Sequence, residues 1–137
     1  MADNKTLLCS CDIPGRSVST NRIWRHGQGR TYKSKETREF EELATSLMKQ
    51  AQRLPTWNGN ACIYIEVWRE KKYRYDLDNR IKLIQDCTQK AGIIKDDAQI
   101  SEVHAVKCIG EDEHIHVELY AVPEIDARPQ KRKSKGE

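Results

Sequence analysis

Long apolar runs are missing from this chain of 137 residues. No stretch approaches the roughly 20 apolar residues of a membrane-spanning helix, and the N-terminus lacks the apolar core of a signal peptide. Aromatic residues are also scarce, with a single phenylalanine, whereas charged residues make up 33% of the chain. We therefore expect a soluble, cytoplasmic protein with one thin, two-layer domain and no membrane partner.

Cysteine pairs of the CxxC type are absent too, and the five cysteines are an odd number. A disulfide framework is therefore not expected in a reducing compartment. One alternative combines Cys9 and Cys11 with His114 and His116. If their two strands were neighbours, two sulfurs and two nitrogens could hold a tetrahedral zinc ion. Ordinary alternation in two amphipathic strands explains the same spacing.

The net charge of +3 is small but unevenly distributed. Residues 14–38 sum to +6 and residues 127–137 to +4, so two basic segments flank an acidic body. This distribution predicts a polyanionic partner. We expect a domain over residues 1–122, followed by a basic and disordered tail over residues 123–137.

Hydrophobic patterning predicts an α+β fold in one domain, a small mixed β-sheet packed with two main helices in the order β-α-β-α-β-β. The expected strands are residues 5–13, 61–69, 99–109 and 114–122, and the expected helices are residues 34–53 and 78–92. Residues 61–69 carry large apolar side chains on both faces, which predicts a central strand. The last two strands are expected to form a hairpin, and residues 14–33 a long polar loop.

The most informative segment runs from Asp76 to Lys82 and is followed by the pair Asp96-Asp97. In an extended segment the side chains of Asp76 and Asp78 point to the same side, and Lys82 follows one helical turn after Asp78. We expect the turn at Gly92 to return Asp97 beside this pair. Carboxylates so close repel each other unless a cation joins them. Oxygen ligands alone predict Mg²⁺, with Mn²⁺ as a possible substitute and no small-molecule cofactor.

Each of these residues also has a simpler interpretation. Asp78 alone is explained as a helix cap. Asp86 is explained as the i+4 partner of Lys82 on a solvated helix face. The pair Asp96-Asp97 alone is typical of a turn. Their combination favours the metal site.

The acidic segment resembles the signature of RusA-type Holliday junction resolvases. The similar positions are Asp76-Leu-Asp-Asn79, Lys82, Asp86, Gly92-Ile-Ile, and Asp96-Asp97 followed by Gln99-Ile100. The stretches Asn21–His26 and Gly29–Thr31, with Ser34, are similar to the basic N-terminal loop of that family. The resemblance covers roughly residues 5–122. It does not extend to the insertion Gly15–Thr20 or to the tail after Pro123.

The resemblance implies a crossover junction endodeoxyribonuclease that acts in DNA recombination and repair, of a type frequent in phages and prophages. Asp76, Asp78 and Asp97 are implied as catalytic metal ligands, and Lys82 as a residue that assists catalysis. A homodimer would nick two strands of a four-way DNA junction. The alternatives are a metal nuclease acting on flaps or forks, and a non-catalytic DNA-binding protein or prophage regulator on the same scaffold.

Branched DNA is recognised mainly through its shape and its phosphates, so basic residues in loops are the expected contacts. The candidates flank the first loop and the acidic segment, and they are Arg22, Arg25, Arg30, Lys33, Arg69, Lys71, Lys72 and Arg74. Trp24 and Tyr32 could stack on exposed bases near the branch point. Packing against the first helix explains both aromatic residues equally well.

Overall fold

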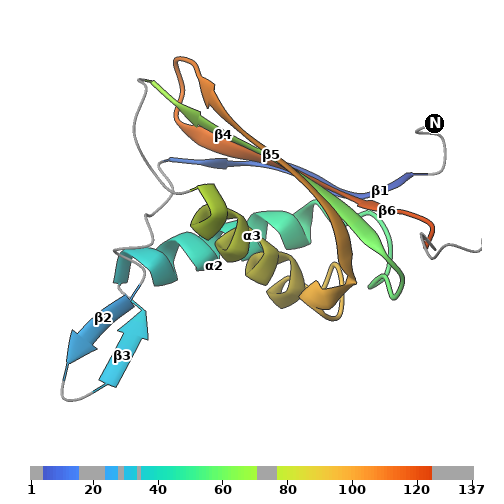
Figure 1. Ribbon diagram of the computed structural model, residues 1–137, viewed down its shortest axis with the longest axis horizontal. Coiled ribbons are helices and arrows are strands. Elements are labelled where there is room, and N and C mark those ends of the chain that lie inside the picture. The colour runs from blue at the N-terminus through green and yellow to red at the C-terminus, as the bar shows by residue number, and fades with distance from the viewer. Residues whose placement is uncertain (1–4, 16–23, 28–29, 34, 71–76, 125–137) are drawn as a thin grey trace, which may run out of the picture.

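A four-stranded mixed sheet forms the body of the protein, and two helices cover one of its faces (Figure 1). The computed structural model describes residues 5–15, 24–27, 30–33, 35–70 and 77–124. The sheet contains β1 (Thr6–Pro14), β4 (Ala61–Arg69), β5 (Ile100–Ile109) and β6 (His114–Ala121), and the helices are α2 (Lys35–Gln50) and α3 (Leu77–Lys90). This arrangement confirms the predicted α+β class and the predicted order of the main elements.

The strand order is β1-β6-β4-β5, which makes β4 a central strand as its two apolar faces predicted. β4 pairs in parallel with β5 and antiparallel with β6. The expected hairpin of β5 and β6 is therefore wrong, because β4 lies between them. Every residue of β4 except Tyr64, Glu66 and Trp68 is buried, and these three lie on the face opposite the helices. The central strand is therefore buried on its helix-covered face and only partly covered on the other.

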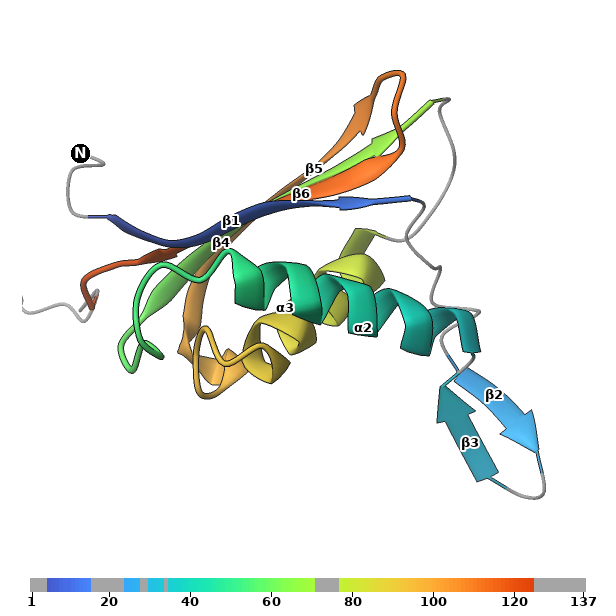
Figure 2. The ribbon, with the colours of Figure 1, turned by 180° about the vertical axis from the view of Figure 1, so that it is seen from behind.

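The segment that was expected to be a polar loop, residues 14–33, contains two short paired strands. β2 (Trp24–Gly27) and β3 (Arg30–Lys33) pair antiparallel as a two-stranded ribbon, whereas the sequence was expected to form a loop here. Two positions separate the strands, which is the commonest hairpin loop length. The ribbon projects away from the sheet, beyond the N-terminal end of α2 (Figure 2).

Helix α2 packs on the sheet through one stripe of side chains. Phe40, Ala44 and Met48 are buried at i, i+4 and i+8, the spacing of one helix face. Leu43 and Leu54 continue the apolar spacing of this stripe in the sequence but are each 41% exposed, because Leu43 lies at the margin of the face and Leu54 beyond the helix end. Among the described residues, no helix combines the length and the apolar character needed to cross a bilayer.

Helix α3 is the crossover that joins the parallel strands β4 and β5. It ends at Lys90, and Gly92 in the turn that follows has a φ of 79°, which is in the left-handed region that glycine tolerates. The N–H of Ile93 bonds the carbonyl of Thr88 at 3.1 Å, and the N–H of Gly92 bonds that of Gln89 at 3.0 Å. These contacts satisfy the last carbonyls of the helix and confirm the predicted stop at Gly92.

Candidate active site

The first turns of α3 contain the described part of the acidic segment. Asp78 is exposed in that turn, and Lys82 is exposed one turn later on the same helix. A carboxylate at this position interacts favourably with the positive end of the helix dipole. Asp76 lies outside the described residues, so its relation to Asp78 stays a prediction.

The second acidic pair forms a closely hydrogen-bonded turn. Asp96 caps the short helix η2 (Asp97–Gln99) by accepting the N–H of Ala98 at 2.9 Å. The side-chain oxygen of Gln99 accepts the N–H groups of Lys95 and Asp96, each at 2.9 Å. Asp96 therefore has a structural use, whereas the side chain of Asp97 is exposed next to it.

This turn is tied both to the body of the protein and to α3. Gln99 donates to the carbonyls of Trp57 and Gly59 at 2.9 and 2.8 Å. The N–H of Asp97 donates to Oε1 of Gln89, in the last turn of α3, at 3.1 Å. The backbone that carries Asp97 is thus held by specific hydrogen bonds, which is the preorganisation that a ligand site needs.

Asp78 and Asp97 do not come together in one protomer. Asp97 lies beside the C-terminal end of α3, and Asp78 lies in the first turn of the same helix (Figures 1 and 2). The eleven residue steps from Asp78 to Gln89 span about 16 Å of helix axis at 1.5 Å per step. The expected return of Asp97 beside the first acidic pair is therefore wrong. The turn at Gly92 sends the chain on into β5 and not back along α3.

The predicted DNA contacts fall into three sets: residues of the ribbon, residues outside the described part of the chain, and Arg69. Arg25, Arg30 and Lys33 belong to the projecting ribbon of β2 and β3, and the remaining candidates except Arg69 lie outside the described residues, namely Arg22, Lys71, Lys72 and Arg74. Arg69 is buried at the end of β4, with Nε 3.6 Å from a carboxylate oxygen of Glu113. In this position Arg69 has a structural ion pair, so a phosphate contact would require that pair to open.

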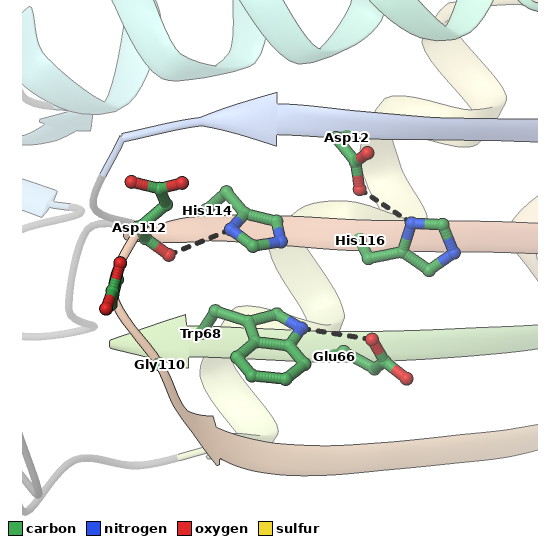
Figure 3. Close-up of a pocket in the computed structure, with 8 residues that line it drawn as sticks. Asp12, Glu66, Trp68, Gly110, Asp112, His114 and His116 are labelled. Carbon is green, nitrogen blue, oxygen red and sulfur yellow. Dashed lines mark hydrogen bonds and ion pairs between the residues drawn. The ribbon is translucent and has the colours of Figure 1, made fainter. Parts of the chain in front are cut away.

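The face of the sheet opposite the helices carries a shallow pocket that the sequence did not reveal (Figure 3). Trp68 and His114 stack there with ring centroids 5.7 Å apart. The other lining side chains are largely acidic: Asp12, Glu66, Glu111, Asp112 and His116, beside Gly110. A concentration of carboxylates repels phosphates, so this pocket is poorly suited to DNA.

His116 links two strands of that face. Nδ1 lies 2.6 Å from Asp12 and Nε2 lies 2.7 Å from Glu118. Burial lowers the pKa of His116, but the hydrogen bonds to Glu118 and Asp12 outweigh burial and leave the pKa raised. The hydrogen bond from His116, together with one from Tyr120, lowers the pKa of Glu118. The charged forms of His116 and Glu118 thus stabilise each other.

The zinc alternative is only half right about the geometry. β1 and β6 are neighbours, as that alternative required. However, Cys11 pairs with the buried Val117, and Cys9 donates to a carbonyl of α2, so both face the helices. His116 points to the opposite face with Asp12. Across the described part of the chain, the two cysteines and two histidines therefore do not form one zinc site.

Comparison with known proteins identifies the family. The sequence model of the family described as Endodeoxyribonuclease RusA matches residues 14–120. A crossover junction endodeoxyribonuclease RusA of Shigella sonnei is 36% identical over 89 residues, which cover 65% of this chain and 74% of the relative. The proteins of that name from Escherichia coli K12 and Enterobacteria phage 82 are 35% and 34% identical over the same lengths. The acidic motif thus indicated the right family, and the chain belongs to the RusA family of endodeoxyribonucleases.

Proposed function

We propose that this protein is a homodimeric, Mg²⁺-dependent endonuclease that resolves Holliday junctions by paired nicks during DNA recombination and repair. Family membership and the names of its relatives, one of them from a phage, support this reaction and a phage or prophage type. The observation that carries the proposal is the exposure of Asp78 in the first turn of α3 and of Asp97 on the hydrogen-bonded turn beside the other end of that helix.

The donor set fits a hard divalent cation. The proposed ligands Asp76, Asp78 and Asp97 offer only carboxylate oxygens, which suit Mg²⁺ and also Mn²⁺. Such an ion, when bound, lowers the pKa of a water nucleophile and neutralises the phosphodiester. The ammonium group of Lys82, one turn from Asp78, would stabilise the negative charge that develops on the phosphate oxygens.

A dimer is needed to bring these ligands together. Since α3 separates Asp78 from Asp97 within one protomer, we infer that each site combines Asp76 and Asp78 of one protomer with the partner's Asp97. Two helices related by a two-fold axis and running antiparallel would place unlike ends side by side, twice. This arrangement supplies two active sites per dimer, as two nicks in a junction require.

The basic residues around these sites would hold the DNA arms. Arg22, Arg25, Arg30 and Lys33 lie on or before the projecting ribbon, and Lys71, Lys72 and Arg74 precede Asp76 in the sequence. Phosphate contacts from such residues fix the position of the junction without sequence readout. Trp24 and Tyr32 belong to the two strands of the ribbon, and we propose that they stack on bases.

Mixed dimers test both the ligands and their arrangement. Asp78→Asn and Asp97→Asn homodimers should bind a synthetic four-way junction but fail to cut it. Coexpression of the two variants with different tags, followed by isolation of the mixed dimer, should restore Mg²⁺-dependent nicking at one of its two sites. A mixture of Asp76→Asn and Asp78→Asn is the matched control and should stay inactive, because both changes affect the same end of α3.

The outcomes separate the parts of the proposal. If the mixed Asp78 and Asp97 dimer stays inactive, each site is built within one protomer. Cutting at the wild-type rate by either homodimer would remove that residue from the site. Parallel assays on flap, fork and duplex DNA would show whether the junction is the preferred substrate. No nicking of any of them would favour the non-catalytic DNA-binding alternative.

A further inference from the structure

Three side chains with different ligand atoms meet on the face of the sheet opposite the helices. Cys62 of β4 and Glu102 of β5 are direct partners in the parallel pairing, and His104 is two residues further along β5. Their sulfur, carboxylate oxygen and imidazole nitrogen all lie within 4.8 Å of one another. The register of two paired strands fixes this group, which gives it a well-defined backbone frame.

The separation of two of these atoms is informative. Nε2 of His104 lies 3.7 Å from Oε1 of Glu102, which is too long for a hydrogen bond. It is slightly longer than the separation of roughly 3.3–3.6 Å that a tetrahedral zinc ion imposes on a nitrogen and an oxygen ligand with bonds of about 2.0–2.2 Å. Cys62 supplies the third ligand atom, with its sulfur within 4.8 Å of both others. Its two partners are partly exposed and can adjust, whereas Cys62 itself is fully buried on the central strand.

Neighbouring rings orient the imidazole. Tyr64 stacks on His104 with centroids 4.7 Å apart and an interplanar angle of 15°. Tyr120 contacts Tyr64 edge-on at 6.1 Å. Fixing the plane of a ligating histidine in this way is what the surroundings of metal sites commonly do. The ammonium group of Lys5 lies over the Tyr64 and Tyr120 rings, 5.2 and 5.9 Å from their centroids. Its positive charge would weaken the binding of a metal ion beside these rings.

We propose that Cys62, Glu102 and His104 form a second divalent-metal site, which takes a borderline-soft ion such as Zn²⁺ with water as fourth ligand. The thiolate and the imidazole distinguish it from the carboxylate site proposed for Mg²⁺. The thiolate and the carboxylate together neutralise the ion. Bound metal would tie the edge strand β5 to β4 close to the point where η2 and Asp97 precede β5. The proposal does not depend on the nuclease reaction.

Cobalt substitution tests the site directly. The full-length chain would be stripped with a chelator under reducing conditions and titrated with Co²⁺ in excess Mg²⁺. We expect one Co²⁺ per chain with a thiolate-to-cobalt charge-transfer band in the near ultraviolet, and displacement of Co²⁺ by Zn²⁺ without displacement by Mg²⁺. Zn²⁺ should raise the melting temperature by a few degrees.

Variants assign the ligands. Cys62→Ser should abolish the charge-transfer band, and His104→Gln, a change at a half-exposed position, should weaken Zn²⁺ binding by about a hundredfold. Lys5→Met should strengthen binding by removing a nearby positive charge. Cys108→Ser removes a thiol of β5 that is not a proposed ligand; it is the control and should bind metal like the wild type. The proposal fails if no stoichiometric Co²⁺ binds, or if Cys62→Ser and His104→Gln both bind as the wild type does.

Discussion

The backbone N–H of Asp97 donates a hydrogen bond to the side chain of Gln89, 3.1 Å away, at the end of α3 opposite to Asp78. A glutamine in the last turn of the helix thus holds the backbone of a proposed metal ligand. Nothing in the sequence motif singles out Gln89, because its contribution depends on the turn that follows the helix.

Replacing Gln89 with leucine should therefore impair catalysis without impairing folding. The change keeps the size of the side chain but removes the acceptor for the Asp97 N–H. We expect junction cleavage to fall roughly ten- to a hundredfold, since small displacements of a catalytic group are costly. Single-turnover cleavage and junction affinity would be measured together, with Gln85→Leu as the same change one turn earlier. A wild-type cleavage rate for Gln89→Leu would show that this bond does not position Asp97.

The pairing of Arg69 with Glu113 predicts a loss of stability when Glu113 is removed. Glu113→Ala leaves the buried guanidinium without this carboxylate, and we expect the free energy of unfolding in urea to fall by about 2 kcal/mol. Arg69→Met removes the charge but keeps the apolar stem, and it should cost less. If Arg69→Met folds normally but binds junctions several-fold more weakly, then Arg69 contacts DNA as its sequence position suggested.

Two residues of α2 form a matched pair for testing the core. Met48 is fully buried, so Met48→Ala should lower the free energy of unfolding by about 3 kcal/mol. Leu43→Ala on the same helix should cost less than about 1 kcal/mol, because Leu43 is 41% exposed. Chemical denaturation measures both values. Equal losses would mean that Leu43 is covered in solution, for example by a second protomer.

The His116 cluster predicts a stability difference that depends on pH. Because the pKa of His116 is raised from its ordinary value of 6.5 in the folded state, its contribution is complete below that value and is lost as the pH rises through the raised pKa. The pKa of Glu118 is lowered from 4.5, so its contribution is present above that value and is lost as the pH falls through the folded-state pKa.

The variant His116→Asn should therefore be less stable than the wild type by about 1 kcal/mol near pH 5.5, a value that allows for solvent screening. The difference should shrink toward zero at about pH 9, where the wild-type histidine is neutral. Urea denaturation at both pH values measures it. A difference that is the same at both would assign the loss to packing and not to charge.

The sequence predicted the elements whose signals are local. The alternation in residues 61–69, the apolar stripe of α2 and the stop at Gly92 each depend on neighbours within a few positions, and all three are confirmed. The order of strands was harder, because the short link between β5 and β6 suggested a hairpin. The long-range pairing of β4 with both β5 and β6 places it between them, and no local pattern in the sequence reports that pairing.

In the candidate site, too, the features with local signals were predicted and those that depend on long-range arrangement were not. The exposure of Asp78, Lys82 and Asp97 agrees with their proposed roles, and the pair Asp96-Asp97 forms the predicted turn. The separation of Asp78 from Asp97 was missed because spacing gives the length of a helix but not the direction in which the chain leaves it. The group of Cys62, Glu102 and His104 was missed because strand register brings its members together from two distant segments.

The length of α3 has a consequence for the product of the reaction. In a dimer that shares its ligands as proposed, the two centres are separated by the stretch of α3 from Asp78 to Gln89, about 16 Å along its axis. The length of the helix would then set the distance between the two cut phosphates. Inserting one turn would move the centres apart by about 5 Å and change the spacing of the two nicks, even with every ligand intact. Insertions should accordingly be tolerated in the surrounding loops and selected against within this helix.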